Sequence, residues 1–117
     1  MNPDEFVHAV HQVCVIAPQR GLAKFLRHPS GRSPRPEDRD LSEWFAALPA
    51  TDQRAVLAVA RRAAELATFN FLSVLDGVLP IEGPGPKSSL ELWQARGHDR
   101  TLLNPPEGEM LHDLLPE

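Results

Sequence analysis

The segment Thr51–Gly77 constrains the fold more than any other, because it reads as one uninterrupted helix that changes character halfway along. At about 100° per residue, one face collects Val56, Val59, Ala60, Ala63, Ala67, Asn70, Phe71, Val74 and Val78. Charged residues occupy the opposite face of the first half, whereas the second half, from about Thr68, is apolar nearly all round. A helix without a polar face has to be covered, so we expect a covering layer over this half.

Helix signals also recur before the long helix. Asn2 is an N-cap followed by a proline at the first helical position, and Pro18 is predicted to end this helix. A second, short helix is expected at 18–27, and residues 28–39 read as a proline-rich loop. A capping-box pattern at Asp40 then predicts a third helix.

Beyond Gly77 the pattern changes to short strands and turns. Residues 78–82 are predicted to form a short strand, and 89–95 and 100–103 to pair as an antiparallel hairpin around a tight turn. A hairpin alone is only marginally stable in water, so we expect it to pack on the apolar half of the long helix. A short amphipathic helix at 110–115 is expected near the C-terminus.

These elements predict an α+β fold in a single domain, 1–117. A mainly helical part, about 1–77, places four to five helices around one long central helix. A small antiparallel hairpin sheet and the terminal helix occupy about 78–117. Because Asn70 and Asp76 interrupt its apolar run, the long helix is not expected to span a membrane.

The charges are distributed unevenly along the chain, whose formal net charge is −4. Residues 1–36 carry a net +3, residues 37–66 a net −2, and residues 67–117 a net −5. The acidic C-terminal third argues against a nucleic-acid surface and suits a basic protein partner, although a merely soluble surface has the same composition. The N-terminal segment lacks the positive charge and the apolar length of an export signal, so we expect a cytoplasmic protein.

Few residues suggest chemistry. His8 and His11 have a helical spacing that can hold a metal ion, but they face away from the apolar stripe and have no third ligand, so no metal site is predicted. That stripe consists of Phe6, Val7, Val10, Val13, Cys14 and Ala17. The single cysteine, Cys14, is therefore expected in the core rather than as a nucleophile. No nucleotide-binding or hydrolase motif occurs, so we predict no catalytic residue and no cofactor, and favour binding over enzyme activity.

Three polar residues define an alternative site. Asn70 sits in the apolar stripe of the long helix, where an unpaired buried amide costs about 1–3 kcal/mol. It is either a structural amide that holds the backbone of the hairpin or a loop, or part of a pocket. Asp76 stands at the negative end of the helix and needs an arginine or backbone N–H groups to stabilise it. With His112, these two residues would line the pocket of a small enzyme or ligand-binding protein.

Trp93 is predicted to share a strand face with Glu91, opposite Leu90 and Leu92. Either Trp93 points outward as an interface anchor among carboxylates, or the terminal helix covers it. In the first case, the predicted partner-binding surface includes Glu82, Glu91, Trp93 and Asp99.

The stretch FNFLSVLDGVLPIE, followed by LEL, LLN and GEMLHDLL, resembles a group of small, mostly uncharacterised bacterial proteins. These share a long helix with this ending, then a hairpin and a terminal Leu-His-Asp-Leu helix. The resemblance covers about 69–115, and two features depart from it: Pro80, within the predicted strand 78–82, and the GPGP insertion that follows this strand. Some small acidic bacterial proteins of this size are immunity proteins that neutralise a toxin, and the resemblance implies that role.

The sequence therefore favours a non-catalytic protein-binding domain, an immunity-type inhibitor that occludes the basic active site of a bacterial toxin. The alternative is a small enzyme or ligand-binding protein with a pocket near Asn70, Asp76 and His112. Neither nucleic acid nor a membrane is an expected partner, and the sequence predicts no oligomeric state.

Overall fold

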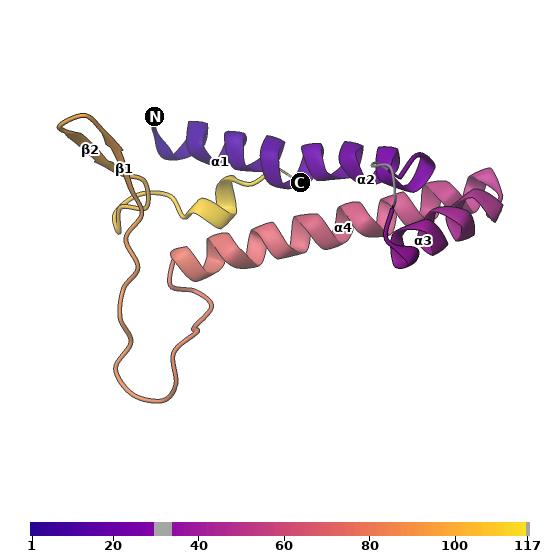
Figure 1. Ribbon diagram of the computed structural model, residues 1–117. Coiled ribbons are helices and arrows are strands. Elements are labelled where there is room, and N and C mark those ends of the chain that lie inside the picture. Colours follow the sequence, from indigo (N-terminus) through magenta and orange to yellow (C-terminus); the bar gives the residue numbers. More distant parts are fainter. Residues whose placement is uncertain (30–33, 117) are drawn as a thin grey trace.

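The computed structural model describes residues 1–29 and 34–116, and it is an elongated pair of helical rods with a small hairpin at one end (Figure 1). α1 (Pro3–His11), the π-helical turn η1 (Gln12–Ile16) and α2 (Ala17–Arg27) continue into one another as the first rod. α4 (Ala50–Leu75) is the second, and α3 (Pro36–Ala47) packs against α2. The fold is therefore mainly helical and of the α+β class.

The number of helices differs from the prediction. Because α1, η1 and α2 form one rod, the described residues contain three long helices rather than four to five. Pro18 does not end the first helix, since the backbone widens into a π-helical turn immediately before it, in which the Ala17 N–H bonds to the Gln12 carbonyl. A wider turn relieves the clash that a proline ring makes with the carbonyl four residues earlier.

The start of α4 was predicted correctly, whereas the start of α3 was not. α4 agrees with the predicted long helix to within two residues. α3 begins at Pro36, and Glu37 and Asp38 in its first turn complement the helix dipole. Asp40 therefore lies inside the helix and is not its cap. The predicted loop 28–39 is correspondingly shorter, and its residues 30–33 lie outside the described residues.

The hairpin was predicted in the right place. β1 (Trp93–Arg96) pairs antiparallel with β2 (Asp99–Leu102), and Trp93 is opposite Leu102. Gly97, with φ 61°, occupies the first position of the two-residue turn, as a type II′ turn requires. No strand forms at 78–82, which belongs to an extended, exposed loop after α4, because Pro80 cannot donate to a ladder and no neighbouring strand accompanies this segment.

The central core lies where α1, α4 and the 3-10 helix η2 (Leu111–Leu114) meet. Val7, Leu72 and Leu111 are at most 1% exposed and contact one another. Partly buried apolar residues surround them: Phe6, Leu75, Leu92, Leu114 and Leu115. A C-terminal layer thus covers the apolar half of α4, but the layer is η2. No residue of the hairpin, 93–102, is buried, and the hairpin extends beyond the N-terminal end of α1 (Figure 1).

The prediction of which side of α4 is buried was wrong. Thr68, Leu72 and Ser73 are the buried residues, whereas Val59 and Phe71 of the predicted stripe are 70% and 63% exposed. The apolar pattern contained two candidate faces, and the position of η2 decides which one is covered. None of the described helices combines the length and hydropathy needed to cross a bilayer.

The buried side of the first helix also differs from the prediction. Its buried residues are Val7, His11 and Val15, at a spacing of four, while Cys14 is exposed. The predictions of a core Cys14 and a solvated His11 were therefore wrong. The contact with η2 selects the side of Val7, and the π-helical turn shifts the angular positions of the residues that follow His11.

Candidate functional site

A buried ion-pair geometry joins the end of α4 to η2. The backbone N–H groups of Leu111 and His112 donate to Asp76 Oδ1 and Oδ2 over 3.0 and 2.9 Å. His112 Nδ1 lies 2.6 Å from Asp76 Oδ2, and the two side chains are only 12% and 4% exposed, respectively. The carboxylate therefore pairs the N–H groups that the start of a helical turn leaves without partners. Asp76 finds the backbone donors that its position required.

This contact also fixes the imidazole. An ionised carboxylate only accepts hydrogen bonds, so His112 Nδ1 is the donor and Nε2 is the nitrogen available to other groups. Nε2 lies 3.4 Å from Asp113 Oδ1. The ring of Phe69 meets the imidazole edge-on, with 5.3 Å between centroids. His112 is thus held from two sides.

An open groove of about 690 Å³ borders His112. Its walls come from α4 and the C-terminal segment, and consist of Arg61, Arg62, Glu65, Leu66, Phe69, His112, Asp113, Leu115 and Pro116. Arg61 is paired with Glu65 over 3.0 Å. The groove combines two guanidinium groups and an oriented imidazole with the carboxylates of Glu65 and Asp113, so its lining carries both signs of charge.

Asn70 does not belong to this site. It lies exposed on α4, so neither the buried structural amide nor the pocket residue predicted at this position exists. The structure brings Asp76 and His112 together and leaves Asn70 apart. Asn70 is on the side of α4 that η2 does not cover, where a polar amide is solvated.

Asn104 is the structural amide that the sequence reasoning missed. Its Nδ2 donates to the carbonyls of Leu75 and Leu90, each over 2.9 Å. Its Oδ1 accepts the N–H of Leu92 over 2.8 Å. One side chain thus connects the end of α4 to the strand region and fixes where the hairpin starts. Its position in the LLNPP stretch, directly after a strand, is the signal that could have identified it.

Trp93 is 42% exposed on β1, and its ring is held on two sides. The indole Nε1 donates to Glu91 Oε2 over 2.9 Å, and the Arg100 guanidinium carbon lies 5.0 Å from the ring centroid. Arg100, on the paired strand β2, was not among the predicted site residues. The structure thus favours the outward orientation of Trp93 over coverage by the terminal helix.

The other predicted partner-binding residues are spread out. Asp99 lies opposite Arg96 at the turn end of the hairpin. Glu82 lies in the loop after α4, where its carboxylate accepts hydrogen bonds from the Ser88 N–H (2.7 Å) and hydroxyl (3.1 Å). Figure 1 shows this loop and the hairpin extending away from each other. Glu91 and Trp93 form one unit, and Glu82 stands apart from it.

The described parts of the chain, 1–29 and 34–116, contain no group of three His, Cys, Asp or Glu side chains placed to hold a metal ion. His8 is exposed and His11 is buried, so the two histidines do not present a shared face to solvent. No protein-family model matches this chain, and neither the curated proteins nor the solved structures contain a significant match to it.

Proposed function

We propose that this chain is a non-catalytic protein-binding domain, and that it inhibits a bacterial toxin by covering the toxin's active site. The observation that carries the proposal is the exposed Trp93 ring, held between Glu91 and Arg100. Tryptophan and arginine are the residues that most often dominate the binding energy of protein interfaces. A side chain already fixed before binding loses less conformational freedom when the partner arrives.

The surface is centred on Trp93, Glu91 and Arg100, and Asp99 forms its edge. Arg96 and Arg100 offset the carboxylates of Glu91 and Asp99, so this surface is not strongly acidic. The net −5 of residues 67–117 is instead distributed over the loop and the C-terminal segment. This distributed negative charge accelerates the approach of a basic partner, while the tryptophan supplies the affinity after contact.

The resemblance to small bacterial proteins supports a toxin as the partner. Inhibition by occlusion requires a complementary surface and no catalytic group. The surface around Trp93 is consistent with this, because its polar side chains bind one another and fix the tryptophan ring. The buried Asp76–His112 pair and the Asn104 contacts then hold the hairpin segment and η2 in place behind that surface.

Affinity capture from the native host, followed by co-expression with each captured toxin, tests the proposal. Trp93→Ala should weaken partner binding by roughly 30-fold or more, the loss typical of an interface hot spot, and abolish rescue of the cells. Trp44→Ala is the matched control, because Trp44 is 51% exposed on α3, away from the hairpin. Equal binding by both variants, or a captured partner whose toxicity the chain does not suppress, would refute the proposal.

The charge contribution has its own test. Glu82→Gln, Glu91→Gln and Asp99→Asn together should slow association with a basic partner and flatten its dependence on salt. If the association rate and its salt dependence stay unchanged, these carboxylates are not part of the steering surface.

A second candidate function is binding of a small anionic ligand in the groove beside His112. The observation that favours it is the imidazole fixed by Asp76 in a groove that Arg61 and Arg62 also line, although the carboxylates of Glu65 and Asp113 compete for these groups. Inorganic phosphate and small carboxylates should then raise the melting temperature, and the double variant Arg61→Gln, Arg62→Gln should lose the shift. An unchanged melting temperature across millimolar concentrations of these anions removes this candidate.

A further inference from the structure

The register of the hairpin decides which main-chain groups face outward. Bonded and non-bonded pairs alternate along an antiparallel ladder, and the Leu103 N–H donates to the Leu92 carbonyl over 2.8 Å. Trp93, one residue further along, therefore belongs to a non-bonded pair, and so does Ala95. The N–H and carbonyl groups of Trp93 and Ala95 thus point away from β2, along the outer edge of β1.

Within the described parts of the chain, 1–29 and 34–116, no group bonds to the main-chain N–H or carbonyl of Trp93 or Ala95. Ala95 is exposed, and Trp93 is 42% exposed. The edge also lacks the features by which proteins usually protect one, because β1 contains no proline, no lysine and no break in its register. A two-stranded hairpin without a buried residue is only marginally stable, so an added strand would stabilise it.

The outer edge of β2 is less suited to pairing. By the same alternation the main-chain groups of Arg100 and Leu102 face outward there, but the two prolines of the LLNPP stretch follow closely and cannot donate to a third strand. Leu102 is also half-buried. By contrast, residues 87–92 lead into β1 without a bend or turn, so its edge continues back to Glu91 (Figure 1). A pairing strand therefore has more of β1 than of β2 to bond to.

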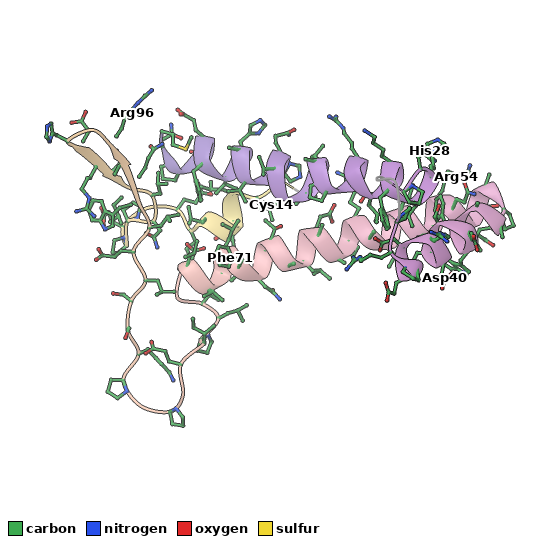
Figure 2. All side chains as sticks on the ribbon, in the orientation of Figure 1. Cys14, His28, Asp40, Arg54, Phe71 and Arg96 are labelled. Carbon is green, nitrogen blue, oxygen red and sulfur yellow. The ribbon has the colours of Figure 1, made fainter. Side chains whose placement is uncertain are left out.

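Charges distinguish the two ends of this edge. Glu91 and Trp93 project from one face of the hairpin and bond to each other, while on the other face the Met1 amino group donates to Gln94 Oε1 over 2.8 Å. Glu91 is negative where the edge begins, and Arg96 is positive where it ends. Figure 2 labels Arg96 on the hairpin, beyond the end of the helical rods. A complementary strand therefore has a basic residue beside Glu91, an apolar residue beside Trp93 and an acidic residue beside Arg96.

We propose that the protein partner adds an extended segment as a third strand along the outer edge of β1, with a basic side chain beside Glu91 and an apolar one beside Trp93. In this mode of recognition the main-chain hydrogen bonds supply affinity and the alternate side chains select the sequence. The proposal rests on the proposed function, because Trp93 belongs to the same surface, and it names the kind of segment that the partner presents.

Peptides selected on the wild-type chain from a random library displayed on phage are the probe, so the test does not require the toxin. Ala95→Pro removes one outward N–H and leaves the bonds to β2 intact, since Ala95 lies in a non-bonded pair. It should weaken binding of the selected peptides by roughly tenfold, whereas Ala95→Val, which keeps the N–H, should bind them like the wild type. Equal binding by the two variants, or a selection without any peptide that depends on this N–H, overturns the proposal.

Hydrogen exchange on the wild-type chain gives a readout that does not depend on whether Ala95→Pro folds. The amides of Trp93 and Ala95 should exchange roughly tenfold more slowly when a selected peptide is bound. The amides of Arg100 and Leu102, on the edge of β2, are the internal control and should not change. Protection of the β2 edge instead, or of neither edge, contradicts the proposal. A free chain that light scattering finds at twice 13.0 kDa, and that Ala95→Pro returns to 13.0 kDa, contradicts it too, because a second copy would then occupy the edge.

Failure of the strand pairing and failure of the toxin inhibition give different results. If Trp93→Ala abolishes rescue of the cells while Ala95→Pro rescues them like the wild type, the chain is an inhibitor that does not use this edge. If the selected peptides depend on the Ala95 N–H but the chain suppresses no captured toxin, the edge pairs with an extended segment and the proposed toxin inhibition is wrong.

Discussion

His112 Nδ1 lies 2.6 Å from Asp76 Oδ2, although 36 positions separate the two residues in the sequence. The same carboxylate accepts the backbone N–H groups of Leu111 and His112. Three hydrogen bonds to one nearly buried charged group thus attach the C-terminal segment to the end of α4. Since η2 also supplies Leu111 to the core, this contact positions the layer that covers Leu72.

Replacing Asp76 should therefore destabilise the whole fold. In Asp76→Asn the side chain loses its charge and brings an NH₂ group against backbone donors, so we expect a loss of about 2 kcal/mol in the free energy of unfolding. The melting temperature should fall by roughly 10 °C for a domain of this size. Asp113→Asn, at a carboxylate whose side chain is 60% exposed, should change stability by less than about 0.5 kcal/mol. Similar urea midpoints for both variants would show that Asp76 has no such role.

The long helix and the hairpin were predictable because their signals are local. Caps, prolines and periodicity act within a few residues, and Gly77 ends α4 with φ 79°, as its position indicated. Which side of each helix is buried was not predictable, because that depends on η2, which arrives from the far end of the chain. The same cause explains why Cys14 and Phe71 are exposed while His11 is buried.

The sequence predicted the kinds of residue in the candidate site, but not which residues contact one another. A structural amide that holds the hairpin backbone does exist, yet it is Asn104, in a loop, and not Asn70, on the long helix. Periodicity could place Asn70 on a stripe, but it contains no information about contacts across 29 positions, such as that between Asn104 and Leu75. The stacking of Arg100 on Trp93 likewise depends on strand register.

The two asparagines form a matched pair for mutation. Asn104→Ala removes three hydrogen bonds and leaves the Leu75 and Leu90 carbonyls without this partner, so it should cost about 2 kcal/mol. Asn70→Ala should be neutral or stabilise by up to about 0.6 kcal/mol, because alanine has the higher helix propensity at an exposed position. Denaturant titrations of both variants measure the difference. The opposite order would mean that Asn70, not Asn104, is the structural amide.

Two leucines of α4 test the position of the core. Leu72 is 1% exposed and contacts Val7 and Leu111, so Leu72→Ala should cost about 3 kcal/mol through lost burial and the cavity left behind. The identical change at Leu66, which is 55% exposed, should cost less than about 1 kcal/mol. Chemical unfolding followed by far-UV circular dichroism measures both. Equal losses at the two positions would contradict the buried face described for α4.

Two glycines test the backbone at the end of α4. Gly77 has φ 79°, and the Gly77 and Val78 N–H groups bond back to the Val74 and Ser73 carbonyls, which is the Schellman arrangement. A side chain is strained in this conformation even though the space around Gly77 is open, so Gly77→Ala should destabilise by about 1 kcal/mol. Gly21 lies exposed within α2 at an ordinary helical φ, and Gly21→Ala should stabilise by about 0.5–1 kcal/mol. The same substitution should therefore shift the melting temperature in opposite directions at the two sites. A gain at both positions would show that α4 does not end in the left-handed turn that directs the chain into its exposed loop.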